Sequence, residues 1–146
     1  IANTPECLEG LVKVLEGEKN NKQKFAVNVL DNLAKCPENR EKIAKTPNYL
    51  KELATVLNNN NNREGQKFAA GALTKLSTSS KYKNKIANTQ GCLGGLVKIL
   101  NDNINPEGQK FAAVALMNLA QYPENRKIIA ETPKCLSSLV NVLKNF

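Results

Sequence analysis

The residues best placed to do chemistry in this sequence are lysines and asparagines that recur at a fixed spacing. The tetrapeptide Gln-Lys-Phe-Ala occurs three times, so that one lysine repeats every 43 residues as Lys24, Lys67 and Lys110. Asn32 and Asn118 follow the first and third of these lysines by eight residues. An ammonium group attracts carboxylates, and a side-chain amide can bond the backbone of an extended peptide in both directions. This pattern favours a binding surface.

Residues that support catalysis or metal binding are scarce. The sequence has no His, and its four Cys residues form no CxxC pair, so that a catalytic triad or a zinc site lacks its usual groups. Carboxylates do not recur at matching positions of the repeating pattern. We therefore expect a protein that is not an enzyme, with no catalytic residues, no metal and no cofactor.

The recurring lysine belongs to a unit that repeats through the whole chain. The string that starts at Gln109, QKFAAVALMNLA, has counterparts that start at Gln23 and Gln66, and a second string, Ile-Ala-x-Thr, occurs four times. The chain begins inside a unit and without Met, so we expect a fragment of a longer protein. The predicted organisation is one domain of about three and a half repeats, with boundaries at 1–36 (partial), 37–79, 80–121 and 122–146 (partial).

Each unit is predicted to form a short helix followed by two longer ones. Apolar residues repeat with the helical period, for example at Leu50, Leu53 and Leu57 in one helix. Proline and capping residues mark the starts. The predicted starts are Pro37 and Pro123 for first helices, Thr4-Pro5, Thr46-Pro47 and Thr132-Pro133 for second helices, and Asn105-Pro106 for a third helix.

Three helices in about 43 residues is the pattern of armadillo repeats. The string AAVALMNLA at 112–120 resembles the family's Ala-Ala-Trp-Ala-Leu-Ser-Asn-Ile-Ala, and four units in register extend the resemblance over the whole chain. The sequence departs from the family in having no Trp and in placing Lys75 where the family has Asn. The resemblance implies an all-α, right-handed superhelical α-solenoid of three-helix repeats, whose third helices line a concave groove.

A helical projection of the third helices predicts which residues face that groove. On the last of them, positions 112, 116 and 119 point to the core and the opposite side points to the groove. Lys and Arg number 21 against 13 Asp and Glu, a net charge of +8, which suits an acidic partner. We predict a protein–protein interaction scaffold or adaptor that binds an extended acidic peptide segment. The predicted peptide-binding residues are Lys24, Asn28, Asn32, Lys67, Lys75, Lys110, Asn118 and Gln121.

Two other functions are compatible with the same sequence. A basic solenoid can bind RNA or DNA, and a second basic row on the first helices, Arg40, Lys83 and Arg126, is the place to look for such contacts. Alternatively, the chain is a structural fragment without binding activity of its own. Nucleic-acid binding would fall more steeply with salt than peptide binding through amide groups.

The repeated phenylalanines, Phe25, Phe68 and Phe111, admit two interpretations. A large ring between the groove strip and the core stripe can fill the seam between adjacent third helices, or it can form an aromatic ladder that faces the ligand. We expect the seam. The asparagine run at 58–62 is expected to be a tolerated surface loop.

The four cysteines are predicted to be small buried thiols. Cys7, Cys92 and Cys135 occupy the same place in different units, where stacked helices lie about 8–10 Å apart, too far for a disulfide. Cys36 stands at a different position, before a first helix. Free thiols favour a reducing compartment, so that we expect a cytoplasmic or nuclear protein. No apolar stretch approaches the roughly 18 residues of a membrane span.

The last predicted helix has no third helix after it. Leu136, Leu139 and Leu143 would then form an apolar stripe with no partner. Terminal repeats normally need a polar cap. We therefore expect self-association through the C-terminal end, head-to-tail, as a property of the fragment.

Overall fold

The computed structural model describes residues 5–17 and 20–145, and within these ranges every regular element is an α-helix. The helices fall into the predicted pattern of three per unit. Their bounds are α1 Pro5–Leu15, α2 Asn20–Leu33, α3 Pro37–Lys45, α4 Tyr49–Leu57, α5 Arg63–Leu76, α6 Ser80–Asn88, α7 Cys92–Leu100, α8 Pro106–Ala120, α9 Pro123–Glu131 and α10 Cys135–Lys144. The prediction of a longer second helix is wrong for α4 and α7, which have nine residues, as the first helices α3 and α6 do, and only the third helices of these units are longer.

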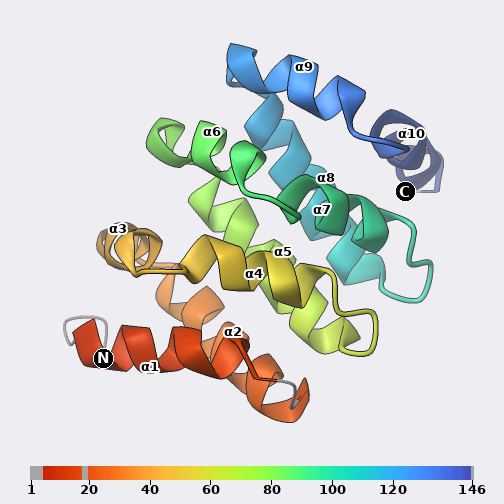
Figure 1. Ribbon diagram of the computed structural model, residues 1–146. Helices are drawn as coiled ribbons and strands as arrows, with labels where there is room; N and C mark the ends of the chain where they lie inside the picture. The colour runs from red at the N-terminus through yellow and green to blue at the C-terminus, as the bar shows by residue number, and fades with distance from the viewer. Residues whose placement is uncertain (1–4, 18–19, 146) are drawn as a thin grey trace.

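The helices stack in three columns (Figure 1). First helices are α3, α6 and α9, second helices are α1, α4, α7 and α10, and third helices are α2, α5 and α8. In the second column α4 packs against α1 and α7, and α7 packs against α10. In the third column α5 lies between α2 and α8. The chain is thus the all-α superhelical solenoid that the sequence predicts.

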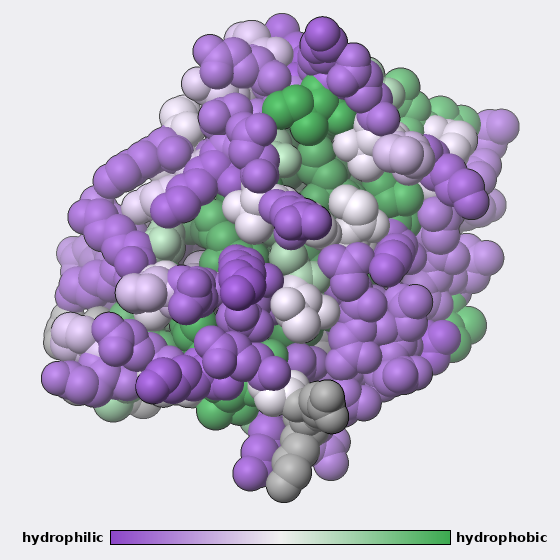
Figure 2. All heavy atoms as spheres, in the orientation of Figure 1, coloured by the Kyte–Doolittle hydropathy of each residue, from purple (hydrophilic) through white to green (hydrophobic). Residues whose placement is uncertain are grey.

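The core runs between the second and third columns. Leu53 and Leu57 of α4 and Leu73 of α5 are fully buried. In α8 the predicted core positions Ala112, Leu116 and Leu119 are buried as well, which confirms the helical projection. The face drawn in Figure 2 is largely hydrophilic, with hydrophobic side chains visible toward the end that carries α9 and α10. Among the described residues no helix is both long and apolar enough to cross a membrane.

Helix starts are confirmed where a proline or an asparagine begins a first or third helix. Helices α3, α8 and α9 each begin with proline, and the Asn105 side chain accepts from Gly108 N at 3.1 Å as the cap of α8. Helix α1 begins at Pro5 as predicted, while Thr4 lies outside the described residues.

The predicted caps Thr46 and Thr132 are wrong. Both threonines end a first helix, and their backbone N–H groups donate to the carbonyls of Ile43 and Ile129. The second helices begin three residues later, each after a residue in left-handed backbone conformation that turns the chain between helices. These residues are Asn48 (φ 66°), Gly91 (φ 89°) and Lys134 (φ 63°).

The asparagine run lies in the loop between α4 and α5, as expected, and two of its side-chain amides also bond the preceding repeat. Asn59 Nδ2 donates to Asn20 Oδ1 at 3.0 Å and to Gln23 Oε1 at 3.2 Å. Asn62 Nδ2 donates to Gln23 Oε1 at 3.1 Å, while Asn62 Oδ1 caps α5 by accepting from Gly65 N at 3.0 Å. The side-chain amides of Asn59 and Asn62 therefore link the loop before α5 to the first turn of α2.

The prediction of buried thiols is confirmed for two cysteines and wrong for two. Cys92 and Cys135 are buried, and burial raises the pKa of Cys92 to about 12 and also raises that of Cys135. Cys7 is exposed because, within the described part of the chain, no second helix packs on its side of α1, whereas Cys92 lies against the Leu50 carbonyl of α4. Cys36 is exposed in the turn before α3. All four are free.

Candidate functional site

The three third helices lie side by side and bring one lysine each to the same side of the molecule. Lys24 is on α2, Lys67 on α5 and Lys110 on α8, each two residues from a buried alanine of the core. Lys110 is exposed, and Lys24 and Lys67 are partly exposed. Since α5 packs on both of its neighbours, the three positions follow one another along the solenoid.

Two of the four predicted groove lysines have acidic partners inside the molecule. Lys67 Nζ lies 3.4 Å from Glu64 Oε2 and 3.6 Å from Glu107 Oε2. Lys75 Nζ donates to the carboxylate of Asp31, which is itself buried. Their charges are largely compensated. Within residues 5–17 and 20–145 no carboxylate lies within ion-pair distance of Lys24 or Lys110, so that neither of these lysines forms an ion pair with that part of the chain.

The predicted peptide-binding asparagines also differ in whether they have a partner on another helix. Asn118 is only 9% exposed, and its Nδ2 donates to Thr74 O at 3.4 Å and to Ser77 Oγ at 3.1 Å. Its amide thus joins α8 to α5 and does not present its donors to the groove. Asn32 is exposed and donates to Asn28 Oδ1 at 3.1 Å, so this pair on α2 remains accessible.

Gln121 and two apolar side chains lie on the predicted groove side of α8 and at its C-terminal end. Gln121 is exposed, and its Oε1 accepts from Lys83 Nζ at 3.4 Å. Val114 is 38% exposed and Met117 is 59% exposed. The predicted set of peptide-binding residues omits these two, although the helical projection that selected Lys110 and Asn118 also places them on the groove side.

The repeated phenylalanines differ in burial along the stack. Phe68 shares a face of α5 with Gly71 and Lys75. Lys75 donates to Asp31 of α2, and Gly71 lies close to the same carboxylate, because a Cβ at Gly71 would fall 3.2 Å from Asp31 Oδ1. Phe68 and Phe111 are partly buried and pack against the core, which agrees with the seam and not with an exposed aromatic ladder. Phe25 is 61% exposed, so the seam interpretation is wrong for it, because among the described residues α5 is the only third helix that packs on α2.

The basic row on the first helices is bonded inside the molecule. Arg40 Nε donates to Ala34 O, Lys83 Nζ to Ser77 O, and Arg126 Nε to Ala120 O at 2.9 Å. Each cation thereby caps the carboxyl end of a third helix, where unpaired carbonyls favour positive charge. Burial lowers the pKa of Lys83, because it disfavours the charged form. This row therefore has a structural explanation that does not involve nucleic acid.

Among the described residues no group of three or more Asp, Glu, Cys or His side chains could hold a metal ion. The buried thiols with raised pKa values are poor nucleophiles, because the thiolate is the reactive form. What the third-helix face offers is charge at its ends, amides on α2 and apolar contact on α8. These groups can bind an extended polypeptide through charge, hydrogen bonds and apolar contact.

Comparison with known proteins gives matches among solved structures alone. No family model and no curated protein matches the sequence. Two engineered proteins superpose with TM-scores of 0.68 at 23% and 28% identity. A designed armadillo repeat protein in complex with peptide (KR)4 superposes with a TM-score of 0.67 at 25% identity. Each alignment covers 92% of this chain, which spans about half of each neighbour (51%, 50% and 52%). With its stacked three-helix units, the chain has an armadillo-like repeat fold.

Proposed function

We propose that this chain is a peptide-binding repeat scaffold, a non-enzymatic adaptor whose third helices α2, α5 and α8 hold an extended segment of another protein. The observation that carries the proposal is the recurrence of one lysine at the same position of three adjacent helices. The designed armadillo repeat protein that superposes on the chain is in complex with a peptide, which supports binding along this kind of fold.

The charge of the groove favours an acidic segment. Adjacent third helices lie about 8–10 Å apart, and an extended peptide advances about 3.3 Å per residue, so that successive helices meet every third residue or so. Lys24 and Lys110, the two groove lysines without an ion pair among the described residues, would then meet carboxylates about six residues apart. Asn28 and Asn32 can bond the peptide backbone, and Met117 offers apolar contact.

Two labelled peptides of equal length and opposite charge test this preference. The probes are (DE)4 and (KR)4, titrated with the protein in a fluorescence anisotropy measurement at low and at moderate salt. We expect saturable binding of (DE)4 and none of (KR)4. Equal binding of both peptides, or tighter binding of (KR)4, would reject the acidic specificity.

A pair of matched double variants tests the location. Lys24→Ala with Asn32→Ala removes a charge and an amide from the α2 end of the groove, and we expect (DE)4 to bind about five- to ten-fold more weakly. The control, Lys51→Ala with Lys98→Ala, removes two exposed charges from the second helices α4 and α7. An equal loss in both double variants would mean that net charge alone attracts the peptide, and the groove would be rejected.

A single-stranded oligonucleotide serves as the competing ligand in the same measurement. The affinity for the oligonucleotide would fall steeply as the salt concentration rises, and the slope of log affinity against log salt would scale with the number of phosphate contacts. Tighter binding of the oligonucleotide than of (DE)4 at physiological salt would favour the nucleic-acid function. We place the scaffold in the cytoplasm or nucleus, because its exposed thiols, Cys7 and Cys36, are free and suit a reducing compartment.

A further inference from the structure

A small pocket of about 260 Å³ lies between α3 and α6, the first helices of two successive repeats. Its lining comes from α3, from the turn after α5 and from the first turn of α6. The polar residues that line it are Arg40, Glu41, Thr78, Ser79, Lys81 and Tyr82. The helices on both sides of the pocket are part of the described chain, so that it belongs to an internal junction of the solenoid.

The first turn of α6 carries the opposite charge from the first turns of α3 and α9. Those two helices have Glu38 and Glu124 there, whereas α6 has Lys81 at the equivalent position and no acidic residue in its first turn. The first N–H groups of a helix have no partner inside it, and the positive end of the helix dipole attracts negative charge. In α3 and α9 the helix itself supplies this negative charge, and in α6 it does not.

Tyr82, the next residue of α6, has a buried hydroxyl without a partner. Tyr82 is 5% exposed, and among the described residues its hydroxyl is the only buried side-chain polar atom that makes no hydrogen bond. Asn125, the equivalent residue of α9, donates to Lys83 O and to Leu119 O, both at 3.0 Å. Because an unpaired buried hydroxyl is unfavourable, Tyr82 indicates an acceptor that the described chain does not provide.

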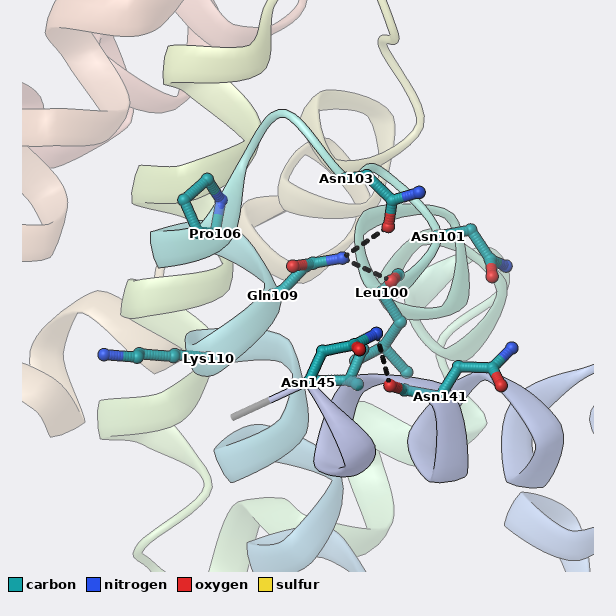
Figure 3. A pocket seen from close by; sticks show the side chains of 9 residues that line it. Leu100, Asn101, Asn103, Pro106, Gln109, Lys110, Asn141 and Asn145 are labelled. Atoms are coloured by element: carbon teal, nitrogen blue, oxygen red, sulfur yellow. Dashed lines mark hydrogen bonds between the residues drawn. The ribbon is translucent and has the colours of Figure 1, made fainter.

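In a larger pocket, of about 940 Å³ beside α8, the side-chain amides have partners within the chain (Figure 3). Gln109 Nε2 donates to Leu100 O at 2.9 Å and to Asn103 Oδ1 at 3.4 Å. Asn145 Nδ2 donates to Asn141 O at 3.0 Å. The pocket between α3 and α6 differs from it in having a buried donor that lacks an acceptor.

Positive charge exceeds negative charge around the pocket between α3 and α6. Glu41 Oε1 lies 3.0 Å from Lys45 Nζ and 3.2 Å from Lys81 Nζ. Hydrogen bonds from these two lysines lower the pKa of Glu41, so that its carboxyl group is ionised at neutral pH. Arg40 donates to two carbonyls just after α2, and among the described residues no carboxylate lies within ion-pair distance of it. Three cations thus surround one carboxylate.

We propose that this pocket binds a phosphate group, either free phosphate or the phosphate of a phosphorylated side chain. Lys81 Nζ lies over the Tyr82 ring, 5.6 Å from its centroid. On binding, Lys81 turns from Glu41 to the phosphate, and this movement uncovers the Tyr82 hydroxyl as a second donor. Arg40 and the first N–H groups of α6 supply further donors.

The number of donors favours phosphate over a carboxylate. A phosphate monoester has three terminal oxygens and nearly two negative charges at pH 7, whereas a carboxylate has two oxygens and one charge. The residues of this site are different from those of the proposed peptide groove. The site therefore does not depend on the proposed function.

The test is an NMR titration of the isotope-labelled protein at constant ionic strength. The probes are inorganic phosphate and a blocked tripeptide, Ala-phosphoserine-Ala, with acetate and the unphosphorylated tripeptide as controls. We expect saturable shifts of the backbone amide signals of Lys81 and Tyr82, with a dissociation constant of about 1 mM. Tighter binding of the phosphorylated tripeptide would identify a phosphoprotein as the source, and tighter binding of inorganic phosphate would identify free phosphate. Absence of saturation up to about 20 mM of either probe, or equal binding of acetate, would overturn the proposal.

Two variants of α6 remove the groups that distinguish this pocket. Tyr82→Phe removes the hydroxyl and keeps the ring, and we expect about three- to five-fold weaker phosphate binding with no loss of thermal stability. Lys81→Glu gives α6 the acidic first turn of α3 and α9, and we expect binding to weaken roughly ten-fold or more. Lower thermal stability of Tyr82→Phe would mean that the hydroxyl has a partner in the folded protein, which would contradict the proposal.

A third variant is expected to act in the opposite direction. Glu41→Gln removes the carboxylate that competes for Lys81, so that phosphate should bind about three-fold more tightly. Lys98→Glu, on the exposed side of α7, is the control for net charge and should leave the affinity unchanged. Equal weakening by Lys98→Glu and Lys81→Glu, or weaker binding by Glu41→Gln, would reject this pocket as the phosphate site.

Discussion

Helices α2 and α5 carry the same Gln-Lys-Phe-Ala start, yet the same residues have different surroundings in each. Phe68 of α5 is partly buried, whereas Phe25 of α2 is 61% exposed. Four residues further along, Ala72 of α5 is fully buried, whereas Val29 of α2 is 37% exposed. The difference is that α5 packs between two third helices, whereas α2 packs against one among the residues that the structure describes.

The second column shows the same contrast. Tyr49 of α4 is buried at the position where α1 has the exposed Cys7. Helix α4 packs on both α1 and α7, whereas in the described ranges α4 is the only second helix that packs on α1. In a stacked repeat, then, a residue's contribution depends on the neighbouring repeat as much as on the residue itself.

The largest test of this contrast compares the same truncation in two helices. Phe68→Ala is expected to lower the free energy of unfolding by about 3 kcal/mol, at the low end of the range for phenylalanine because the ring is only partly buried. Phe25→Ala should cost less than about 1 kcal/mol, since most of its ring is already in water. Chemical denaturation of both variants measures the difference. Equal losses would mean that the neighbouring helix does not explain the burial.

The second test compares two asparagines at equivalent positions. Asn118→Ala is expected to cost about 2 kcal/mol, because it removes the donors that reach Thr74 and Ser77 of α5 and leaves buried polar atoms unpaired. Asn32→Ala should cost less than about 0.5 kcal/mol, because Asn32 is exposed and bonds only Asn28 of its own helix. Thermal denaturation of the two single variants measures both losses of stability. A larger loss for Asn32→Ala than for Asn118→Ala would contradict the prediction.

The smallest expected effect concerns the junction between α1 and α4. At the later junctions of this column Asn58 donates to Gly91 O at 3.0 Å, and Ser138 donates to Asn101 Oδ1 at 3.1 Å. At the first junction Glu16 stands where α4 is followed by Asn58 and α7 by Asn101, and Glu52 stands where α10 has Ser138. Burial, and secondarily the charge of Glu16, raises the pKa of Glu52 above its ordinary value of 4.5.

A raised pKa means that the folded state binds the proton of Glu52 more tightly than the unfolded state does. The resulting stabilisation is complete below pH 4.5 and is lost as pH rises through the folded pKa. Glu52→Gln should therefore raise stability at pH 7 by less than about 1 kcal/mol and have little effect at pH 4. Unfolding curves at both pH values check this, with Glu9→Gln as an exposed control on α1. A gain that is equal at both pH values would exclude a titration effect.

The sequence was sufficient to predict the repeat, the three helices of each unit and the core positions. A 43-residue recurrence and a 3.6-residue apolar period are properties of the amino-acid sequence, and they do not depend on which helices pack together. The caps at Asn105 and Pro123 were predictable for the same reason, because a cap is a local interaction. The starts of the second helices after Thr46 and Thr132 were not predictable in this way. The left-handed residues that precede them, Asn48 and Lys134, are not glycines, so the sequence gives no signal for the turn.

For the candidate groove, the sequence predicted which side of each helix a residue lies on, but not which side chains remain accessible there. A helical projection shows that Lys67, Lys75 and Asn118 point to one side, but it contains no information on what stands beside that helix. Their partners Glu107, Asp31 and Thr74 lie 40, 44 and 44 residues away in the sequence. The sequence by itself thus determined the helices, their repetition and the side on which each residue lies. Tertiary structure alone decided which of these residues remain accessible, because ion pairs and hydrogen bonds across the stack depend on distances between helices that no local pattern specifies.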